Sequence, residues 1–355
     1  MFLKNLQLFD FRNYKQKTLE FSEKNVVFYG KNGRGKTNIL EAISLLSVGK
    51  SWREKSSSDL IFCDEKIAES AKIESQILFE KNSYPDFFKV VIEPRSRNFF
   101  KNDKHISLKS HFGSVPTILF CPEYLTLFSG NKYERQKFFD RFLVQIYPTY
   151  KDNLLKAIKA HQNKTKILKS EFFTEKEISP WNQILSQTIP KIIETRKNFL
   201  EKINPILEQE LKKISQKNDP IEIKLQLAEN FEPTENNILD FFKKNFLREK
   251  AAKKNFIAPQ RDDFVFFLRE KNLTSVASRG EERSVLLSLL SVQKKILQQE
   301  KNVLPILLLD DVFSELDEDR QKYLENLCEK NQTFFTTTHV DHFRSFKNVQ
   351  KIVII

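Results

Sequence analysis

The alternation of apolar and polar residues changes character along the chain. Up to residue 120 the apolar runs are short and bounded by polar turns, which is typical of strands. The runs with strand character are residues 2–11, 17–21, 71–79, 87–92, 98–106 and 115–120. We expect the run from 71 to 106 to form an antiparallel meander, because turn-forming residues interrupt it at 81–83 and 102–103.

Longer patterns with helical periodicity begin at residue 133. They span residues 133–147, 148–169, 181–202, 205–216 and 236–254. Prolines recur in this part of the chain, at positions 180, 190, 205, 220, 233 and 259. Because proline lacks a backbone donor and clashes with the preceding turn, we expect it to separate these helices and to exclude a long coiled coil. The pattern predicts a compact, mainly helical lobe with one strand, at residues 221–227.

A glycine-rich segment lies between a strand pattern at 26–29 and a helical pattern at 39–46. It fits the phosphate-binding loop G-x-x-x-x-G-K-[ST]. Its residues are Gly30, Lys31, Asn32, Gly33, Arg34, Gly35, Lys36 and Thr37. Glycines let backbone N–H groups turn toward a phosphate at a helix N-terminus. The loop therefore predicts ATP binding, with Lys36 reaching the β- and γ-phosphates and Thr37 holding Mg²⁺.

A second acidic element of such a site follows an apolar strand pattern at 304–309. The strand ends in Asp310 and Asp311. A Mg²⁺–nucleotide site needs one carboxylate near the metal and another that orients and deprotonates the attacking water. We assign the first role to Asp310 and the catalytic role to Asp311. The turn at 314–317 is expected beside these acids.

The segment Ser278–Ser284 precedes a helical pattern at 285–298. Ser278 and Gly280 at a helix start form another anion-binding end. One γ-phosphate does not need two such ends from the same lobe, so we expect this end to bind the nucleotide of a partner subunit in an ATP-dependent homodimer. The alternative is an ordinary helix cap by Ser278, or a charged surface patch.

Two further residues are candidates for the nucleotide site. Arg53 follows the phosphate-loop helix by a short loop and is predicted to fold back onto the nucleotide, the alternative being a solvated arginine. His339 ends the strand pattern at 334–338 and is a candidate sensor of the γ-phosphate, the alternative being a structural histidine.

Composition agrees with a partner that carries phosphates. The chain of 355 residues has a formal net charge of +12, and its pI is near 9.3. The pattern at 151–169 is a basic helix face, either for DNA or simply solvated. Its lysines are Lys151, Lys156, Lys159, Lys164, Lys166 and Lys169. The 3 scattered cysteines favour a reducing cytosol, and no signal peptide or membrane span is evident.

Together these patterns predict an α/β fold with two parts. An ATPase lobe at 1–120 and 301–355 would hold a mixed sheet with the phosphate loop, and the antiparallel meander. A helical lobe at 121–300 would be inserted into it and carry the Ser278–Gly280 segment. The length suits about two domains of about 100 to 200 residues each.

The order of these motifs resembles that of ABC-type ATPase heads. Several segments resemble more closely the RecF family of bacterial DNA replication and repair proteins. The segments that carry the resemblance are Phe11–Tyr14, Gly30–Ala42, Gly49–Arg53, Phe120–Leu125, Arg135–Arg141, Arg261–Asp263, Ser278–Gly280 and Leu307–Asp317. The resemblance spans the whole chain. It also implies that Arg12 contacts the nucleotide.

The resemblance implies an ATP-dependent homodimer that binds double-stranded, gapped or junction DNA. With RecO and RecR proteins it would help to load the recombinase during DNA damage repair and the SOS response, at the nucleoid in the cytoplasm. Asp311 is shorter than the glutamate usual in ABC heads, which implies slow hydrolysis. Glu281 stands where the family signature usually has glutamine, and His339 where an acid or another polar residue is common.

Other functions share parts of this chemistry. The nucleotide-binding subunit of a membrane transporter has the same ATPase head, but its partner is a membrane protein. A small-molecule phosphotransferase has a phosphate loop, but it does not need a second anion-binding helix start that faces another subunit. DNA-accelerated hydrolysis and ATP-driven dimerisation distinguish the DNA-binding function from both.

Overall fold

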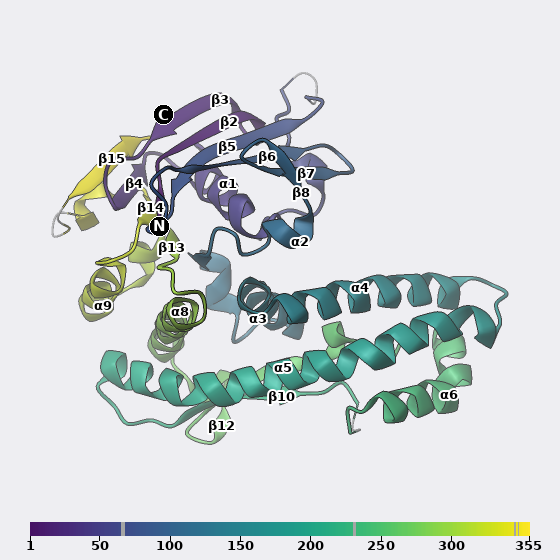
Figure 1. Cartoon of the computed structure of the whole chain (residues 1–355). Helices are drawn as coiled ribbons and strands as arrows, with labels where there is room; N and C mark the ends of the chain where they lie inside the picture. The colour runs from purple at the N-terminus through teal and green to yellow at the C-terminus, as the bar shows by residue number, and fades with distance from the viewer. Residues whose placement is uncertain (65–67, 230–231, 344–345, 347) are drawn as a thin grey trace. The chain divides into compact units, whose positions relative to one another are not determined.

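The computed structural model describes residues 1–64, 68–229, 232–343, 346 and 348–355. The chain divides into two compact units, which are Met1–Leu125 with Arg283–Ile355, and Thr126–Glu282 (Figure 1). The helical lobe was expected to end at residue 300, whereas the second unit ends at Glu282. Most of the helix α8 (Arg279–Lys301) belongs to the first unit, where Lys294 donates a hydrogen bond to the carbonyl of Leu327.

A parallel sheet carries the phosphate loop in the first unit. Its strand order is β15-β4-β14-β13-β9. The strands are β4 (Asn25–Tyr29), β9 (Thr117–Phe120), β13 (Ile306–Asp310), β14 (Thr333–Thr337) and β15 (Val349–Val353). Every pairing is parallel, so the carboxyl ends of β4, β13 and β14 meet at one edge. Topology alone thus brings the loop, the predicted acids and the end of β14 together.

The meander predicted before residue 110 forms a separate antiparallel sheet. Its strand order is β3-β2-β5-β6-β7-β8, with β1 paired to β5. The strands are β1 (Phe2–Leu3), β2 (Asn5–Phe11), β3 (Tyr14–Glu20), β5 (Ala71–Leu78), β6 (Asp86–Ile92), β7 (Arg97–Lys101) and β8 (Lys104–Ile106). Asn102 and Asp103 both have positive φ, 50° and 60°, as a tight hairpin requires. The predicted turn at 102–103 is confirmed.

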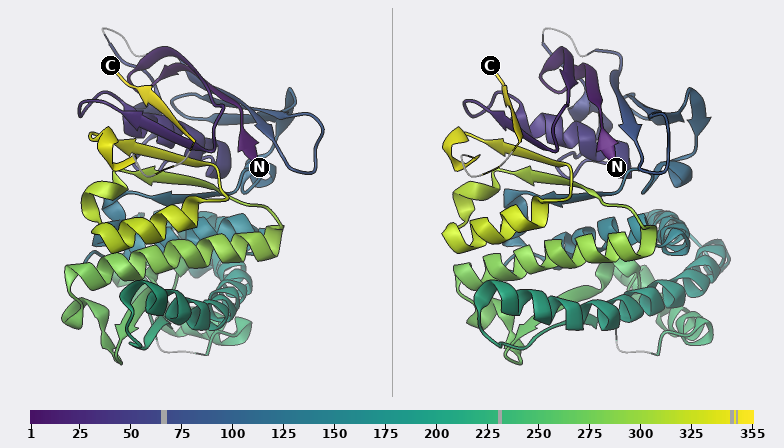
Figure 2. Two further views of the ribbon diagram at one scale, coloured as in Figure 1. Left: turned by 90° about the vertical axis from the view of Figure 1, so that its left-hand side faces the viewer. Right: turned by 60° about the vertical axis from the view of Figure 1, so that its left-hand side comes forward.

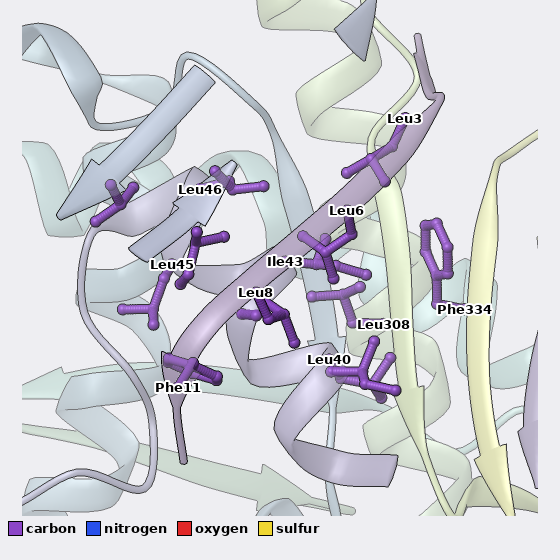
Figure 3. Packing of buried hydrophobic residues seen from close by; sticks show 14 of the residues in the cluster. Leu3, Leu6, Leu8, Phe11, Leu40, Ile43, Leu45, Leu46, Leu308 and Phe334 are labelled. Atoms are coloured by element: carbon purple, nitrogen blue, oxygen red, sulfur yellow. The ribbon is translucent and has the colours of Figure 1, made fainter. Parts of the chain in front are cut away.

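The helix α1 (Lys36–Val48) packs against both sheets of the first unit. Figure 3 shows Leu40 and Ile43 of α1 between Leu6 and Leu8 of β2 and Leu308 of β13. These side chains are fully buried. Each buried aliphatic side chain contributes about 1.5–3 kcal/mol of transfer free energy, so this core fixes the helix that begins the nucleotide site.

Short helical segments and α9 complete the first unit. They are η1 (Ser57–Leu60), α2 (Leu108–His111), η2 (Pro122–Thr126), η4 (Val312–Glu315), α9 (Glu318–Cys328) and η5 (Val340–Phe343). Figure 2 shows α8 and α9 side by side in both views. Arg320 at the start of α9 donates to Ser284 Oγ over 3.0 Å, which joins the start of α9 to the first turns of α8.

The second unit is mainly helical, as predicted. Its helices are α3 (Lys132–Ile146), α4 (Pro148–Lys169), α5 (Glu175–Ser215), α6 (Glu235–Ala252), η3 (Pro259–Arg261) and α7 (Leu273–Val276). The expectation of one strand was wrong, because β10 (Ile221–Gln226) pairs with β11 (Asp263–Leu268), which pairs with β12 (Lys271–Asn272). Alternate burial of Phe264, Phe266 and Leu268 marks β11 as a strand.

The expected break between helices at Pro205 was also wrong. Helix α5 runs through 41 residues with Pro180, Pro190 and Pro205 inside it (Figure 1). Its apolar face packs along α4, α6 and β10. Proline costs about 3 kcal/mol inside a helix, and tertiary burial of side chains such as Ile189 and Ile203 offsets that cost.

A buried arginine connects four segments of the second unit. The guanidinium of Arg196 in α5 binds Asp262 Oδ2 at 3.0 Å and Asp140 Oδ1 at 2.9 Å, and its Nε donates to the Tyr150 hydroxyl at 3.0 Å. Arg196 is fully buried. Burial raises the pKa of Asp262 to about 6 although Arg196 acts in the opposite direction. This cluster therefore fixes α3, α4, α5 and the segment before β11.

The basic face predicted on α4 is partly internal. Lys151 and Lys164 are buried, whereas the other lysines of that set are exposed. Lys164 Nζ lies 2.7 Å from Glu249 Oε2 of α6 and 3.6 Å from the centre of the Phe242 ring. Burial lowers the pKa of Lys164 to about 8, and Glu249 opposes that shift. Lys164 therefore fastens α6 to α4 and does not face a ligand.

We predict that Lys164→Met lowers the free energy of unfolding by about 3–5 kcal/mol, because it leaves the carboxylate of Glu249 buried without its cation. Lys166→Met is the matched control, since Lys166 is exposed on the same helix and its substitution is expected to cost less than about 0.5 kcal/mol. Urea unfolding of both variants measures the difference. Equal stabilities would contradict the assignment of Lys164 to the interior.

Candidate nucleotide site

The phosphate loop connects β4 to α1 through a backbone that only glycine tolerates. Gly30 has φ 148°, and a Cβ there would lie 2.3 Å from the carbonyl oxygen of Ile354. Gly35 has φ 98°, and a Cβ there would lie 2.5 Å from Asn13 Nδ2 and 2.8 Å from the Tyr14 hydroxyl. Both positions combine left-handed backbone with close neighbours. The loop can therefore wrap around a ligand only with these glycines.

The side chain of Lys36 folds back across the phosphate loop. Its Nζ donates to the carbonyls of Gly30 and Lys31, each at 2.8 Å. Burial lowers the pKa of this amine, while the carboxylates of Asp311 and Asp310 act in the opposite direction. The loop thus holds a cation within reach of both predicted acids. That is the arrangement a Mg²⁺-bound triphosphate requires.

Asp310 lies at the centre of the hydrogen bonds at the sheet edge. Its Oδ1 accepts from Thr37 Oγ1 at 2.8 Å and from Thr336 Oγ1 at 2.5 Å. Burial raises the pKa of Asp310, and the two hydroxyls lower it. The predicted metal residues Thr37 and Asp310 therefore meet directly. A carboxylate and a hydroxyl beside a phosphate loop are the hard oxygen donors that suit Mg²⁺.

Asp311 leaves β13 in a different direction from Asp310. Its φ is 46°, in the left-handed region that aspartate tolerates better than most residues. Its N–H donates to Thr336 Oγ1 at 3.0 Å, and its carbonyl accepts from Ser314 Oγ at 2.8 Å. The hydroxyl of Thr336 therefore contacts both acids, the side chain of Asp310 and the backbone N–H of Asp311. The left-handed backbone at Asp311 fixes the direction in which the chain continues.

Arg53 folds back toward the loop helix, and its predicted contact with the nucleotide stays a prediction. Its Nη1 donates to Asn38 Oδ1 at 3.3 Å, and Asn38 Nδ2 donates to Asn13 Oδ1 at 2.9 Å. Asn13 in turn donates to the carbonyl of Arg34 in the phosphate loop at 3.2 Å. The charge of Arg53 also acts to lower the pKa of Asp310. Arg53 thus lies at the rim of the site.

Arg12 binds a protein carboxylate in this structure. Its Nε and Nη2 donate to the two oxygens of Glu41 in α1, at 2.8 and 2.6 Å, and its Nη1 donates to the carbonyl of Asp59 at 2.6 Å. The Glu41 carboxylate is fully buried and also accepts from Ser51 Oγ, which accepts from the N–H of Arg53. Arg12 therefore braces α1 and the loop that carries Arg53.

His339 lies two residues beyond the end of β14 and is exposed. Its N–H donates to Thr337 Oγ1 at 3.0 Å, and its carbonyl accepts from that hydroxyl at 3.2 Å. Because β14 lies between β4 and β13, this turn leaves the sheet at the edge that carries the loop and the acids. The strand β14 therefore ends one residue before the end of the predicted strand at 334–338.

Ser278 caps the helix α8. Its N–H and hydroxyl donate to Glu281 Oε2 at 2.8 and 3.0 Å, and its Oγ accepts from the N–H of Glu281 at 3.3 Å. This reciprocal capping box satisfies donors at the helix start. Arg269 Nη1 lies 2.9 Å from Glu281 Oε1. The N–H of Ser278 and the charge of Arg269 lower the pKa of Glu281 to about 2.

The donors of Ser278 are occupied by Glu281 in this structure. Ser278 is exposed, and Gly280 follows it in the first turn of α8. A phosphate at this end would compete with the Glu281 carboxylate for the donors of Ser278. The helix cap and the predicted anion-binding site therefore use the same donors of Ser278.

Sequence reasoning missed several residues of the site. Glu123 follows β9, the neighbour of β13, and its charge contributes to raising the pKa of Asp310. Its position three residues after a predicted buried strand is a signal for the same sheet edge. Asn13 and Asn38 lie in segments that resemble the RecF family, but their contact with each other and that of Thr336 with Asp310 join residues far apart in the chain, which the sequence pattern does not indicate.

The fold and the site define a P-loop ATPase head of ABC type. Residues 2–354 match the model of the family described as the RecF/RecN/SMC N-terminal domain. The chain is 31% identical over 362 residues to the DNA replication and repair protein RecF of Carboxydothermus hydrogenoformans, covering 100% of this chain and 98% of that protein. It is 33% identical to RecF of Streptococcus suis, covering 99% and 97%. The chain therefore belongs to the RecF family.

Solved structures agree with this assignment. The recombination mediator protein RecF bound to ATPrS, described as part of the RecFOR pathway, superposes with a TM-score of 0.87 at 28% identity, over 99% of this chain and 97% of that one. An Smc head domain from Pyrococcus furiosus has a TM-score of 0.53 at 16% identity, over 100% of this chain and 94% of that one. That second likeness shows a shared fold. The predicted fold class is confirmed.

We predict that Thr336→Val raises the pH at which magnesium-dependent ATP binding is lost on acidification. The hydroxyl of Thr336 lowers the pKa of Asp310, so its removal raises that pKa, and the ionised carboxylate is lost at a higher pH than in the wild type. Magnesium-dependent ATP binding, measured as a function of pH, should show its acidic midpoint moved upward. Thr333→Val, on the same strand but away from the acids, is the control and should leave the midpoint unchanged.

Proposed function

We propose that this protein is an ATP-dependent DNA-binding factor of DNA replication and recombinational repair. ATP binding would pair two copies on gapped or junction DNA, and RecO- and RecR-type proteins would act with them to load the recombinase. The observation that carries this proposal is the joining of Thr37, Asp310 and Thr336 at the phosphate loop, in a chain that RecF proteins match from end to end. We also infer a cytoplasmic, nucleoid-associated location.

The nucleotide chemistry follows from the positions of the side chains. When bound, Mg²⁺ would neutralise charge between the β- and γ-phosphates. Thr37 and Asp310 would hold it, and the backbone of residues 30–37 would donate to the phosphates. Lys36 would leave the carbonyls of Gly30 and Lys31 for the triphosphate. Arg53 would add a second cation at the rim, whereas Arg12 would act through Glu41 and α1.

Hydrolysis would depend on Asp311 and on the turn that follows β14. Asp311 would orient and deprotonate the attacking water, and His339 would report the γ-phosphate to the neighbouring strand. The carboxylate of Asp311 is one methylene shorter than glutamate, so we expect slow turnover, accelerated by DNA. Slow turnover gives a long-lived ATP-bound dimer. A long-lived dimer suits a DNA-binding factor better than it suits a transporter.

The pairing of two copies would use Ser278 and Gly280. These residues would meet the nucleotide of the partner subunit after Glu281 gives up the Ser278 donors. Glu281 makes this end more acidic than glutamine would, and Arg269 offsets part of that charge.

The transporter alternative is not favoured. Relatives named as DNA replication and repair proteins cover this chain along its length. Among the residues that the structure describes, no helix is long and apolar enough to cross a membrane. Sedimentation with ATP, with and without gapped DNA, tests the proposal directly: a monomer that ATP and DNA leave unpaired would overturn it.

We predict that Asp311→Asn keeps Mg²⁺-dependent ATP binding and lowers the hydrolysis rate by about 10²- to 10⁴-fold, because the general base is lost. The ATP-bound dimer should persist in sedimentation. Asp310→Asn is the comparison, and it should lose magnesium-dependent binding as well. Full turnover in Asp311→Asn would remove Asp311 from the catalytic role.

We predict that Ser278→Arg leaves ATP binding to the monomer intact and prevents ATP-driven pairing, because added bulk and charge would face the partner's nucleotide. Mixing it with Lys36→Ala subunits tests the geometry. If the loop and Ser278 come from different chains, the mixed dimer keeps one composite site and recovers part of the hydrolysis. ATP-driven pairing of Ser278→Arg at wild-type strength would contradict the shared site.

A further inference from the structure

The strongest unassigned charge pattern in the second unit lies on α6. From residue 243 to 254 the chain carries basic side chains with Glu249 as the only acid, and Glu249 is buried against Lys164. The exposed basic residues of this stretch are Lys243, Lys244, Arg248, Lys250, Lys253 and Lys254. The acids Glu235 and Asp240 belong to the first turns of the helix. Every charged side chain that is exposed on the second half of α6 is therefore cationic.

The helix dipole does not account for this pattern. Cations are favoured only in the last turn of a helix, where Lys250 lies, whereas Lys243 and Lys244 are two turns or more from the end. Pairing with acids accounts for little of it: the acid of the stretch, Glu249, is paired with Lys164, and Asp240 is the one further acid within four residues of Lys243 and Lys244 along α6. Arg248 and Lys250 contact neutral groups, the Asn245 amide and the carbonyl of Phe173. Like charges at helical spacing repel one another. The structure thus bears a cost that a polyanion would relieve.

An exposed apolar side chain lies in the middle of these cations. Leu247 is 76% exposed. On a helix its surface neighbours are the residues three and four positions away, which are Lys243, Lys244, Lys250 and Ala251. The inward face of the same helix carries Phe242 and Phe246, the latter packed against the Leu168 and Ile178 cluster. Leu247 therefore projects away from the interior.

A second exposed apolar side chain comes from the loop between α4 and α5. Phe172 is 86% exposed. Its neighbour Phe173 packs edge-on against Phe246 with ring centres 6.2 Å apart, and Lys250 Nζ lies 4.9 Å from the Phe173 ring centre. Figure 1 shows α6 beside this end of the α4–α5 hairpin. Phe172 and Leu247 thus belong to one end of the unit.

We propose that the outward face of α6, together with the ring of Phe172, binds single-stranded DNA. The inference rests on the DNA-binding function proposed above and adds a site for it. Closely spaced lysines match the phosphate backbone, whose charges any nucleic acid supplies. An exposed aromatic ring adds affinity only where bases are unstacked and can lie on it. A duplex keeps its bases stacked, so the combination selects the single-stranded part of a gapped substrate.

The test measures binding of labelled oligo-thymidylate and of a duplex of equal length to the full-length protein with ATP, across a salt series. Lys243→Gln/Lys244→Gln should make the log–log salt dependence for the single strand shallower by about 1.4, since each lost contact removes about 0.7. Lys191→Gln/Lys197→Gln is the matched control, because both lysines are exposed on α5. The control should keep the wild-type slope. Equal slopes in both double variants would overturn the proposal.

Phe172→Ala provides an independent measurement. It should weaken single-strand binding by about 5- to 100-fold, as expected for the loss of one stacked base, and leave the salt slope and duplex binding unchanged. Tyr84→Ala, at a ring that is 83% exposed in the first unit, is the control and should have no effect. An equal loss for duplex and single strand would overturn the stacking role.

Competition with poly-L-glutamate distinguishes single-stranded DNA from an acidic protein partner on this face. If poly-L-glutamate competes as well as oligo-thymidylate, and if Phe172→Ala changes neither affinity, the face is a protein contact and the proposal is overturned. If the wild-type protein with ATP binds no DNA of any form, the proposed function itself fails. Retained ATP binding in the Lys243→Gln/Lys244→Gln variant confirms that the nucleotide site is intact.

Discussion

The buried carboxylate of Asp310 is the interaction on which the first unit depends. It joins three segments that are far apart in the chain, because Thr37 lies in the first turn of α1, Asp310 ends β13 and Thr336 lies near the end of β14. A carboxylate taken out of water is unfavourable unless hydroxyls or cations surround it, and burial does raise its pKa. The same desolvation that disfavours Asp310 alone strengthens its attraction for a cation. The carboxylate of Asp310 is thus the centre around which the hydrogen bonds of the site are arranged.

The second unit uses buried charge differently. Arg196 and Lys164 have their carboxylate partners within the protein, at Asp140, Asp262 and Glu249. Such pairs seldom add net stability over apolar packing. They do make alternative arrangements of the helices unfavourable, since a misplaced helix would leave a buried charge without its partner. A 41-residue helix with three internal prolines gains most from such specificity. Rigid placement of α4, α5 and α6 also fixes the surface that they expose.

Much of the site could be predicted from the sequence because it is encoded locally. The loop from Gly30 to Thr37 and the acids after the β13 strand have spacing that the chemistry requires, and parallel strands bring them to one edge. Arg12 was harder, because its partner Glu41 is selected by burial within α1. The expected breaks at Pro180 and Pro205 were wrong, because the apolar face of α5 overrides the low helix propensity of proline. Lys164 appeared solvated because periodicity does not say which lysine faces Glu249.

The burial or exposure of each lysine decides how a basic segment of this chain is interpreted. With a net charge of +12, a basic run on any helix has little specificity by itself. Burial distinguishes individual lysines: Lys151 and Lys164 of α4 are internal although their neighbours on that helix are exposed, and the cations of α6 are exposed around Leu247. A charge that the protein neutralises itself explains stability. A group of charges that faces solvent beside exposed apolar side chains is the basis of the single-stranded DNA site proposed for α6.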